Sequence, residues 1–478
     1  MSATAENIAA PLPEGFTQTI RDIVGPPGII TDPADMEPYL SEERGLFRGV
    51  SPCVVRPAST QEVSRVMGAC YEANVAVVPQ GGNTGLCGGA VASGEVILSL
   101  SRMNAVRAVD PVNFTMTVDA GCILADLQRV ANEHDRLFPL SLGAEGSCRI
   151  GGNLSTNAGG TGVIRYGNTR ELTLGLEVVL PDGRIWDGLT GLRKNNTGYD
   201  LKHLFIGAEG TLGVITGAVL KMFPKPVERH TAFVALRDLE CVLEVLGRAR
   251  KASADTVSGF ELIPRIAIEI SVKHIEGAKD FLNDPHDWCA LIEFETSEAD
   301  AGLGEAMQVF LEAAFEDGLI VDAAIAQSDA QRSEMWFLRE AMVHAQKFDG
   351  ASIKNDVSVP ISSIPEFIRQ ANAATTEACP GLRPMAFGHV GDGNVHYNLQ
   401  QPVEAEREDF LARWDEITGL VADIAHSMRG SFSAEHGIGK LKVGELAEFK
   451  AGVEMDVMRA IKATIDPKGL MNPGKVLG

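Results

Sequence analysis

The sequence lacks most of the features that would assign it to a class at first sight. None of its eight cysteines belongs to a CxxC pair, so neither a zinc–thiolate site nor a disulfide framework is indicated, and reduced thiols in a cytoplasmic setting are expected. No apolar run approaches the roughly 18 residues of a membrane span. Residues 1–11 also lack the apolar centre of a secretory signal, so we expect neither a span nor a signal peptide.

Positive charge and the common nucleotide motifs are scarce as well. With 42 basic and 64 acidic residues, the net charge is −22, which argues against nucleic acid or an anionic membrane surface as a partner. No GxGxxG joins a strand to a helix, and GxxxxGK[ST], HExxH and GxSxG do not occur. A nicotinamide Rossmann domain, a P-loop, a metalloprotease and an esterase are therefore not supported.

What is abundant is glycine, and it is most concentrated in Pro79–Gly89. Five of these eleven residues are glycine, and they follow the apolar run Val75–Val78, which predicts a buried strand. Densely packed glycines let backbone N–H groups point at one ligand without obstruction by Cβ atoms. A tight surface turn is the alternative, but a turn needs only one or two glycines. The segment therefore favours a loop that cradles a phosphate.

A second glycine-rich stretch, residues 139–162, carries seven glycines interleaved with Ser, Thr and Asn. It shows almost no apolar periodicity, so we expect a long loop without secondary structure. Loops of this length inside a compact region are usually functional or disordered, and the apolar segments on both sides disfavour disorder. A second ligand-wrapping loop is the better interpretation, and a linker is the alternative.

The remaining pattern predicts an α+β protein in four parts. Apolar spacing predicts a helix over Thr60–Asn74 and another near 453–465, and an Asp-Gly turn predicts a hairpin over Leu174–Trp186. Two prolines near residue 226 mark a boundary, after which strands and amphipathic helices alternate with few glycines. The parts are a helical lead-in (1–50), a glycine-rich domain (51–226), a second domain (227–425, with a distinctive strand pair at 385–399) and a C-terminal segment (426–478).

Two histidines in the second domain have an unusual setting. His389 and His396 are seven residues apart, which on one straight strand would put them on opposite faces. The intervening Gly391–Gly393 turn can bring both imidazoles to one point, and with Glu435 they would form a ligand set for zinc or a similar ion. His436 would then be available as a general base near neutral pH. Strand histidines with a purely structural role are the alternative.

Taken together, five segments resemble one family. Residues 79–89, 143–162, 207–216, 389–398 and 435–440 are similar to the flavoproteins of the vanillyl-alcohol-oxidase type, and within them to the FAD-linked D-2-hydroxyacid dehydrogenases. The resemblance runs from about residue 45 to the C-terminus. It implies a PCMH-type FAD-binding domain of two α/β subdomains, an α+β substrate or cap domain, and a C-terminal helical return to the flavin.

The resemblance also implies which residues hold FAD. The first loop would bind the pyrophosphate, the second would line the flavin, and residues 213–215 would meet the adenine side. Covalently flavinylated members have a histidine in the first loop, whereas Asn83 stands there in this chain, so FAD should be non-covalent. The implied FAD-binding residues are Pro79, Gly81, Gly82, Asn83, Thr84, Gly85, Leu86, Leu142, Gly143, Ser147, Gly151, Gly152, Asn153, Ser155, Thr156, Asn157, Gly162, Gly213, Ile215 and Asn472.

On the substrate side, the resemblance implies a metal held by His389, His396 and Glu435, with zinc the first candidate, and His436 as the catalytic base. Arg339, Lys354 and Asn398 would bind the substrate, although by residue type alone Arg339 and Lys354 would be solvated charges. One departure concerns Val343: hydroxyglutarate enzymes often carry Thr four residues after the arginine. The missing hydroxyl bears on recognition of a distal carboxylate.

The implied reaction is oxidation of a D-2-hydroxyacid. D-2-hydroxyglutarate, which would yield 2-oxoglutarate, is the first candidate, and D-lactate, glycolate or another 2-hydroxyacid is the rival. Electrons would pass to a separate acceptor of the electron-transfer-flavoprotein or quinone type, and the resemblance is compatible with a homodimer. A flavin-free metal-dependent hydrolase is the alternative from a different class, and the presence or absence of flavin colour distinguishes the two.

Overall fold

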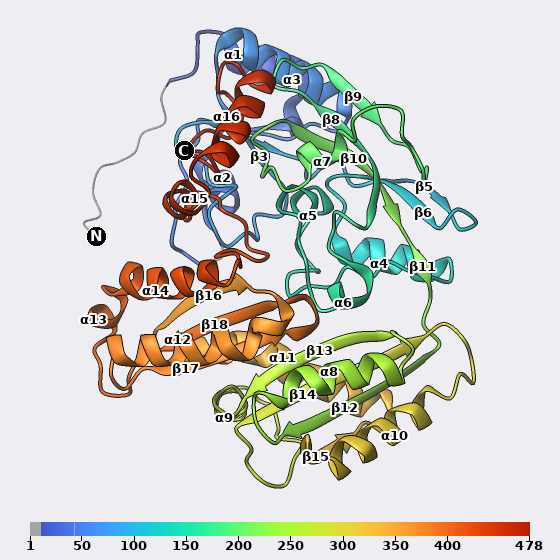
Figure 1. The fold of residues 1–478 in the computed structure, drawn as a ribbon. Helices are drawn as coiled ribbons and strands as arrows, with labels where there is room; N and C mark the ends of the chain where they lie inside the picture. Colours follow the sequence, from blue (N-terminus) through green and yellow to red (C-terminus); the bar gives the residue numbers. More distant parts are fainter. Residues whose placement is uncertain (1–10, 43) are drawn as a thin grey trace. The chain divides into compact units, whose positions relative to one another are not determined.

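The computed structural model describes residues 11–42 and 44–478, so the interpretation of residues 1–11 lies almost entirely outside its described part. The chain forms two compact units (Figure 1). Unit 1 combines the chain up to Gly159 with Asn168–Pro224 and Glu435–Gly478. Unit 2 combines Gly160–Gly167 with Lys225–Ala434. Within the described residues, no helix is both long and apolar enough to cross a membrane.

The first sheet of unit 1 has the strand order β1-β2-β4-β3, and β4 pairs in parallel with β2 and with β3. The predicted helix over 60–74 is confirmed as α3. It begins after Ser59, whose hydroxyl accepts the Glu62 N–H, and ends at Asn74 in the left-handed conformation. The elements are β1 (Ile29–Ile30), β2 (Val54–Val55), β3 (Val77–Gln80), β4 (Val96–Ser99), α1 (Phe16–Val24), η1 (Pro26–Gly28), α2 (Pro33–Leu40) and α3 (Thr60–Ala73).

The second sheet of unit 1 is antiparallel, with the order β5-β6-β10-β8-β9. The predicted Asp-Gly hairpin is confirmed by the pairing of β8 with β9, and Gly183 at φ +88° allows the turn. The elements are β5 (Val106–Asp110), β6 (Thr115–Asp119), α4 (Leu124–Glu133), β7 (Arg136–Leu137), α5 (Ile150–Thr156), β8 (Thr173–Val179), β9 (Ile185–Gly188), α7 (Lys202–Phe205), β10 (Val214–Lys221) and β11 (Phe223–Pro224, paired with β7).

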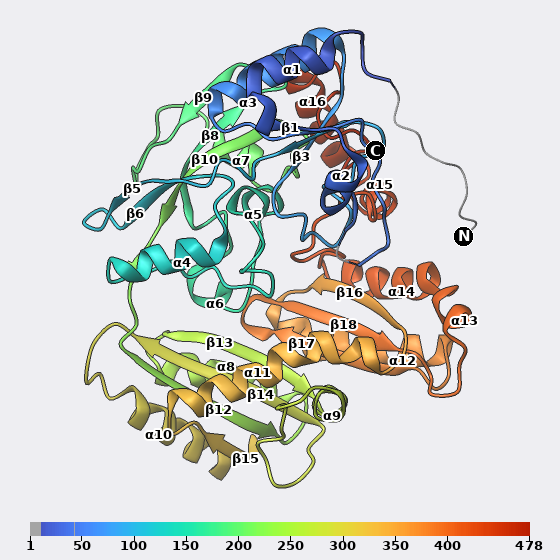
Figure 2. The same cartoon turned by 180° about the vertical axis from the view of Figure 1, so that it is seen from behind.

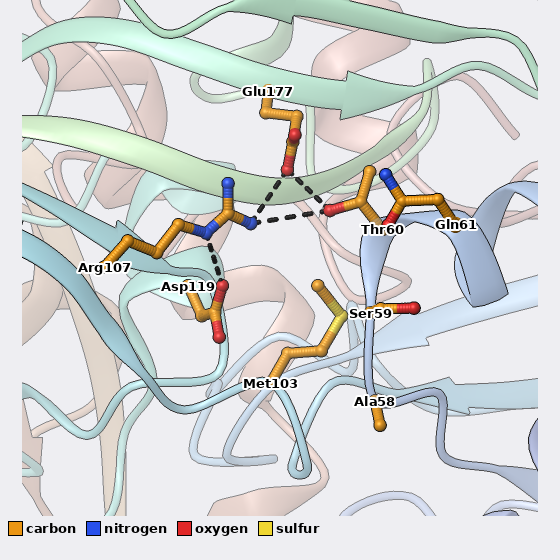
Figure 3. A pocket seen from close by; sticks show the side chains of 8 residues that line it. All are labelled: Ala58, Ser59, Thr60, Gln61, Met103, Arg107, Asp119 and Glu177. Carbon is orange, nitrogen blue, oxygen red and sulfur yellow. Dashed lines mark hydrogen bonds and ion pairs between the residues drawn. The ribbon is translucent and has the colours of Figure 1, made fainter.

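A partly buried ion-pair network joins helix α3 to this second sheet (Figure 3). Arg107 Nε donates to Asp119 Oδ1 at 2.6 Å, and Arg107 Nη2 donates to Glu177 Oε1 at 2.9 Å. Thr60 Oγ1 donates to the same Glu177 oxygen at 2.6 Å. The network lines a polar hollow of about 330 Å³. Because these groups bond to one another, we interpret the hollow as a structural junction.

The C-terminal segment of unit 1 runs back to strand β3. It contains α15 (Val443–Phe449) and α16 (Val453–Ile465), the second as predicted. Beyond α16, Met471 forms a parallel bridge with Val77, and the Asn472 N–H donates to the Val77 carbonyl at 2.8 Å. The last residues therefore lie beside the strand that leads into the first glycine loop.

Unit 2 is built on one antiparallel sheet with the order β15-β12-β14-β13-β17-β18-β16. The strands are β12 (Glu228–Leu236), β13 (Val257–Pro264), β14 (Trp288–Thr296), β15 (Ile320–Ile325), β16 (Ser352–Ser358), β17 (Arg383–His389) and β18 (Asn394–Gln400). The predicted strand–turn–strand at 385–399 is β17, the 3-10 turn η4 (Val390–Asp392) and β18. Strands β17 and β18 are interior strands of the sheet, with β13 on one side and β16 on the other.

Helices cover both faces of this sheet (Figure 1, Figure 2). A larger core lies under α8, α10, α12 and α14, and a smaller one, which includes Phe233, Leu338 and Phe387, lies under α9 and α11. The helices of unit 2 are α6 (Val163–Tyr166), α8 (Cys241–Ala252), α9 (Arg265–His274), α10 (Leu303–Glu316), α11 (Asp329–Ala345), η2 (Gln346–Phe348), η3 (Ile361–Ser363), α12 (Ile364–Ala378), α13 (Arg407–Leu411) and α14 (Trp414–Ser427).

The α+β prediction is confirmed, but the expectation of a structureless loop over 139–162 is wrong. Residues Ile150–Thr156 form helix α5, because Gly151 lets the helix approach Ala120 more closely than a side chain would allow. The same stretch is divided between the units, since Gly160–Gly167 belongs to unit 2. There Tyr166 donates its hydroxyl to Glu295 Oε1 at 2.8 Å.

Candidate functional site

In unit 1 the two glycine-rich segments meet. Strand β3 ends at Gln80 and leads into the first loop, and a Cβ at Gly82 would overlap the Ser147 carbonyl and lie 3.0 Å from the Cys148 Cα. A Cβ at Gly81 would come to 3.5 Å from the Gly152 amide nitrogen. At Gly82 only glycine permits this approach of backbone to backbone, whereas the distance at Gly81 is an ordinary van der Waals contact. The first loop therefore packs directly on the second.

Beside this contact several glycines of the two segments each face open space. A Cβ at Gly85, Gly143, Gly146 or Gly152 would meet no atom within 4 Å. Backbone amides lined up around such a space form a cradle for an anionic ligand. Asn83 lies in the left-handed region at φ 56°, and its Nδ2 donates to the Ser41 carbonyl at 2.7 Å. The arrangement fits the phosphates of a dinucleotide.

The C-terminal Asn472 adds a polar group to the same region. Its Nδ2 donates to the Gly89 carbonyl at 2.9 Å and to the Glu209 carbonyl at 2.7 Å. Its Oδ1 is buried and accepts no hydrogen bond from any residue that the structure describes. A buried acceptor without a protein donor can receive a hydrogen bond from a ligand group or a water at this point. The glycine cradle and this oxygen together fit FAD.

Other residues predicted to bind FAD have different environments. Ser155 and Thr156 donate their hydroxyls to carbonyls of their own helix, and Asn153 is buried with its Oδ1 3.5 Å from Cys148 Sγ. Thr84, Leu86 and Leu142 lie in the two loops, and Asn157 ends α5 at φ 51°. Gly213 and Ile215 lie at the start of β10, where Gly213 packs against Val178. Gly162 precedes α6 in unit 2.

In unit 2 the two histidines do come together. Their ring centroids are 5.4 Å apart, and the rings are nearly perpendicular. Gly388 at φ +143° and Gly393 at φ +87° provide the backbone change between the strands that the sequence pattern predicted. Asp392 lies in the turn, and burial raises its pKa to about 6.

A buried carboxylate links this pair to the predicted substrate-binding arginine. Glu261, on β13, lies with Oε1 2.6 Å from His389 Nδ1 and accepts the Arg339 Nε–H on Oε2 at 2.7 Å. Burial alone would raise the pKa of Glu261, but His389 and Arg339 outweigh it and lower the pKa to about 2. The sequence analysis missed Glu261. The available signal was that Glu261 is the single charged residue in a strand that is buried throughout.

The Arg339 guanidinium is thus fixed through Nε, and its two terminal nitrogens are available to a ligand. Its guanidinium lies 4.9 Å from the Phe387 ring centroid. Among the described residues, none accepts a hydrogen bond from its two terminal nitrogens. A guanidinium fixed through Nε presents a two-pronged donor suited to a carboxylate. Val343 lies one helical turn later on α11 and is exposed.

Strand register places the other predicted residues on the same sheet face. Lys354 is opposite Asn398, and Asp356 is opposite His396. Asn398 Nδ2 donates to Gln346 Oε1 at 2.9 Å, which fixes the Asn398 amide. Asp356, a second carboxylate that the sequence analysis missed, accepts from Asn394 Nδ2 at 2.9 Å and lies 3.6 Å from His396 Nδ1.

The end of unit 2 continues directly into Glu435 and His436. The Ala434 N–H, immediately before them, donates to the Asp356 carbonyl at 3.1 Å. Within unit 2, Asp356 and His396 bring a carboxylate and an imidazole close together. Imidazole and carboxylate donors of this kind suit zinc and related divalent ions. Because His389 Nδ1 faces Glu261, Nε2 is the nitrogen through which His389 could bind an ion.

Comparison with known proteins agrees with this geometry. Residues 51–188 match the FAD binding domain family, and residues 225–476 match the C-terminal domain of FAD linked oxidases. A D-2-hydroxyglutarate dehydrogenase of Xanthomonas citri pv. viticola is 39% identical, with 93% of each chain covered. The mitochondrial D-2-hydroxyglutarate dehydrogenase of Bos taurus is 38% identical, covering 95% of this chain and 82% of that one.

Solved structures share the fold at much lower identity. p-Cresol methylhydroxylase matches with a TM-score of 0.77 at 16% identity over 98% of both chains. Alkyldihydroxyacetonephosphate synthase matches with a TM-score of 0.71 at 18% identity, covering 98% of this chain and 87% of that one. The fold and the two family matches are those of an FAD-linked oxidase. Within that class the chain belongs to the D-2-hydroxyglutarate dehydrogenase family, which confirms the resemblance and the predicted enzyme class.

Proposed function

We propose that this chain oxidises D-2-hydroxyglutarate to 2-oxoglutarate. The observation that carries the proposal is the Arg339–Glu261–His389 chain, which presents an open guanidinium beside two imidazoles on one sheet face. A carboxylate bound by Arg339 would hold the neighbouring α-hydroxyl near those imidazoles. Relatives that are 35–39% identical and named for D-2-hydroxyglutarate support this substrate.

FAD would be held in unit 1 by the amides of the first glycine loop and by the open space at Gly85, Gly143 and Gly152. Asn472 Oδ1 would accept a hydrogen bond from it. Bound FAD supplies the two-electron acceptor for the substrate hydride. Because Asn83 stands in the first loop, we expect no covalent bond. Acid precipitation should leave the yellow colour in the supernatant, and colour retained in the pellet would contradict this.

A divalent ion, with zinc the first candidate, would be held by His389, His396 and Glu435. Asp356 is a further candidate ligand because its carboxylate lies 3.6 Å from His396 Nδ1. Such an ion supplies Lewis acidity that lowers the pKa of a bound hydroxyl. Glu261 would set the orientation of the His389 ring through Nδ1.

The chain's own residues would then perform three tasks. Arg339 and Lys354 would bind substrate carboxylate oxygens, and Asn398, fixed by Gln346, would add a polar contact. Positioning of this kind supplies much of an enzyme's rate. The His436 imidazole would take the proton of the α-hydroxyl as the α-hydrogen leaves with its electron pair. Phe387 and the core under α11 would exclude water from one side.

D-Lactate is the rival substrate, and the valine at position 343 is the feature that favours it. A valine at this exposed position of α11 offers no hydroxyl to a second carboxylate. Anaerobic bleaching of the bound flavin by D- and L-2-hydroxyglutarate, D-lactate and glycolate distinguishes the candidates. We expect the D-isomer of 2-hydroxyglutarate to be fastest. Faster bleaching by D-lactate would overturn the substrate, and a colourless protein would favour the hydrolase.

Electrons would leave through a separate acceptor of the electron-transfer-flavoprotein or quinone type. One relative from Saccharomyces cerevisiae is named a D-2-hydroxyglutarate–pyruvate transhydrogenase, which makes pyruvate worth testing as an acceptor. We propose a reducing, cytoplasmic setting because all eight cysteines are buried and none of them forms a disulfide. A homodimer is the assembly to test by light scattering.

A further inference from the structure

One carboxylate in unit 1 has no part in the reaction described above. Glu209 lies in the turn between α7 and β10, within Gly207–Gly213. Its Oε1 accepts the Ile438 N–H at 2.7 Å, and its Oε2 accepts the Gly439 N–H at 2.8 Å. Both carboxylate oxygens are thus used on successive amides of the loop that begins with Glu435 and His436.

Two glycines leave room for this carboxylate. A Cβ on Gly437 would lie 2.7 Å from Glu209 Oε1, and a Cβ on Gly89 would lie 3.1 Å from Oε2. Any side chain on Gly437 would therefore displace the carboxylate from its amides. Gly437 and Gly89 therefore provide the space that the Glu209 carboxylate occupies.

The backbone of Glu209 is held as firmly as its side chain. Its N–H donates to the Ser155 carbonyl at 2.8 Å, and its carbonyl accepts from Asn472 Nδ2 at 2.7 Å. One residue therefore contacts helix α5 of the second glycine segment, the C-terminal segment and the His436 loop, and it lies against the first loop at Gly89. All these contacts are within unit 1.

The backbone conformation of Glu209 indicates that this position needs the glutamate side chain. Glu209 has φ 50°, in the left-handed region where glycine or asparagine is the ordinary choice. Its neighbour Gly210, at φ +71°, has glycine as expected. A glutamate persists in such a conformation when surrounding contacts fix it, and strained residues of this kind gather at functional sites.

We propose that Glu209 is a positioning residue that holds the His436 loop against the FAD-binding segments. The inference rests on the proposed role of His436 as the base. The loop contains Gly437 at φ +74° and Gly439 at φ +54°, and these two residues restrict its conformation little, although the Lys440 and Leu441 N–H groups donate to the Cys87 carbonyl further along. Two charge-assisted hydrogen bonds to a carboxylate supply what the glycines lack.

Replacement of Glu209 by glutamine tests this, because the amide NH₂ cannot accept a hydrogen bond from a backbone N–H. Flavin reduction by saturating D-2-hydroxyglutarate, measured anaerobically per bound FAD, should slow about 10- to 100-fold, the cost of a small misplacement. The half-saturating substrate concentration should change little, because Arg339 and Lys354 are untouched. Glu209→Asp, which keeps the charge and tolerates the left-handed conformation, should recover part of the rate.

The decisive measurement is a double-mutant cycle with His436→Ala. If Glu209 acts through His436, Glu209→Gln should cost almost nothing further in the His436→Ala background. Equal losses in both backgrounds, or an unchanged rate in Glu209→Gln alone, would overturn the positioning role. If His436→Ala itself reduces flavin at the wild-type rate, the base assignment fails instead, so the two failures are distinguishable.

Glu177→Gln is the matched control. Glu177 is also a glutamate of unit 1 that accepts several hydrogen bonds, but its partners are Thr60, Arg107 and Thr216. It should lower thermal stability and leave the reduction rate per bound FAD unchanged. A slowing equal to that of Glu209→Gln would show a general effect of losing a buried carboxylate and would overturn the proposal.

Discussion

His389 Nδ1 lies 2.6 Å from Oε1 of Glu261, and this contact sets the chemistry of both residues. It gives Nδ1 a fixed partner, so the ring presents its other nitrogen in one orientation. The second oxygen of the same carboxylate receives Arg339 at 2.7 Å. A predicted metal ligand and a predicted substrate-binding residue are therefore positioned by one buried anion.

Glu261→Gln should weaken metal binding through His389 and substrate binding through Arg339 at the same time. The amide keeps the volume but loses the charge that balances Arg339, and loss of such a partner typically costs about 10- to 100-fold in metal affinity. We expect less zinc after dialysis and a higher KM, with FAD content unchanged. Elemental analysis and steady-state kinetics check this. Glu269→Gln, an exposed ion-pair partner of Arg265, is the control, and full zinc retention in Glu261→Gln would contradict the prediction.

Val343→Thr should shift specificity toward the longer diacid. Val343 is one turn from Arg339 on α11, and a threonine hydroxyl there can donate to a distal carboxylate. A hydrogen bond to a charged group is worth about 1.5 kcal/mol or more, so the ratio of kcat/KM for D-2-hydroxyglutarate over D-lactate should rise about 10-fold. Val343→Ala removes the methyls without adding a donor and should not raise it. Equal gains on both substrates would refute this role of position 343.

Much of this arrangement could be predicted from local patterns. The hairpin at Asp182-Gly183 and helix α3 follow from turn chemistry, capping and periodicity, and the meeting of His389 with His396 follows from the glycine turn. Helix α5 could not be predicted, because Gly, Ser, Thr and Asn have low helix propensity and the close approach of Gly151 to Ala120 is a tertiary contact.

The missed site residues have a similar cause. Glu261 reaches His389 through the pairing of β13 with β17, a contact between residues 128 positions apart in the sequence. Asp356 reaches His396 through the register of β16 and β18. Strand order in a seven-stranded sheet is a global property, so no local pattern identifies which carboxylate will face which histidine.

Asp349 should contribute to the acid sensitivity of unit 2. Burial would raise the pKa of its carboxyl, but hydrogen bonds from Lys273, His274 and Arg383 outweigh this and lower the pKa well below its ordinary value of 3.8. A lowered folded-state pKa gives stability that is complete above about pH 3.8 and is lost as the pH falls further. The Asp349→Asn variant should therefore be less stable than the wild type at pH 6. Between pH 4 and pH 2.5 it should lose less stability than the wild type does.

Urea unfolding at several pH values, followed by circular dichroism, measures this difference. Asp317→Asn is the control, since Asp317 is an exposed partner of Arg248 and should leave the pH dependence as it is. Parallel pH dependences for wild type and Asp349→Asn would show that Asp349 does not contribute to acid unfolding.

Alanine substitutions at Gly82 and Gly85 should have different effects, the first on the stability of the apoprotein and the second on FAD binding. At Gly82 a Cβ would collide with the Ser147 carbonyl, so Gly82→Ala should destabilise the apoprotein by about 1–3 kcal/mol, as overpacking does. At Gly85 a Cβ would meet nothing within 4 Å, so Gly85→Ala should leave the apoprotein stable and weaken FAD binding by filling the cradle.

Thermal unfolding of the apoproteins and FAD titration by fluorescence quenching test the pair. Gly247→Ala is the control: it lies exposed in helix α8 with no atom near the added Cβ, and it should raise stability by about 0.5–1 kcal/mol without affecting FAD. If Gly85→Ala binds FAD as tightly as wild type, the open space at Gly85 is not where FAD binds. The phosphates would then have to lie elsewhere along the first loop.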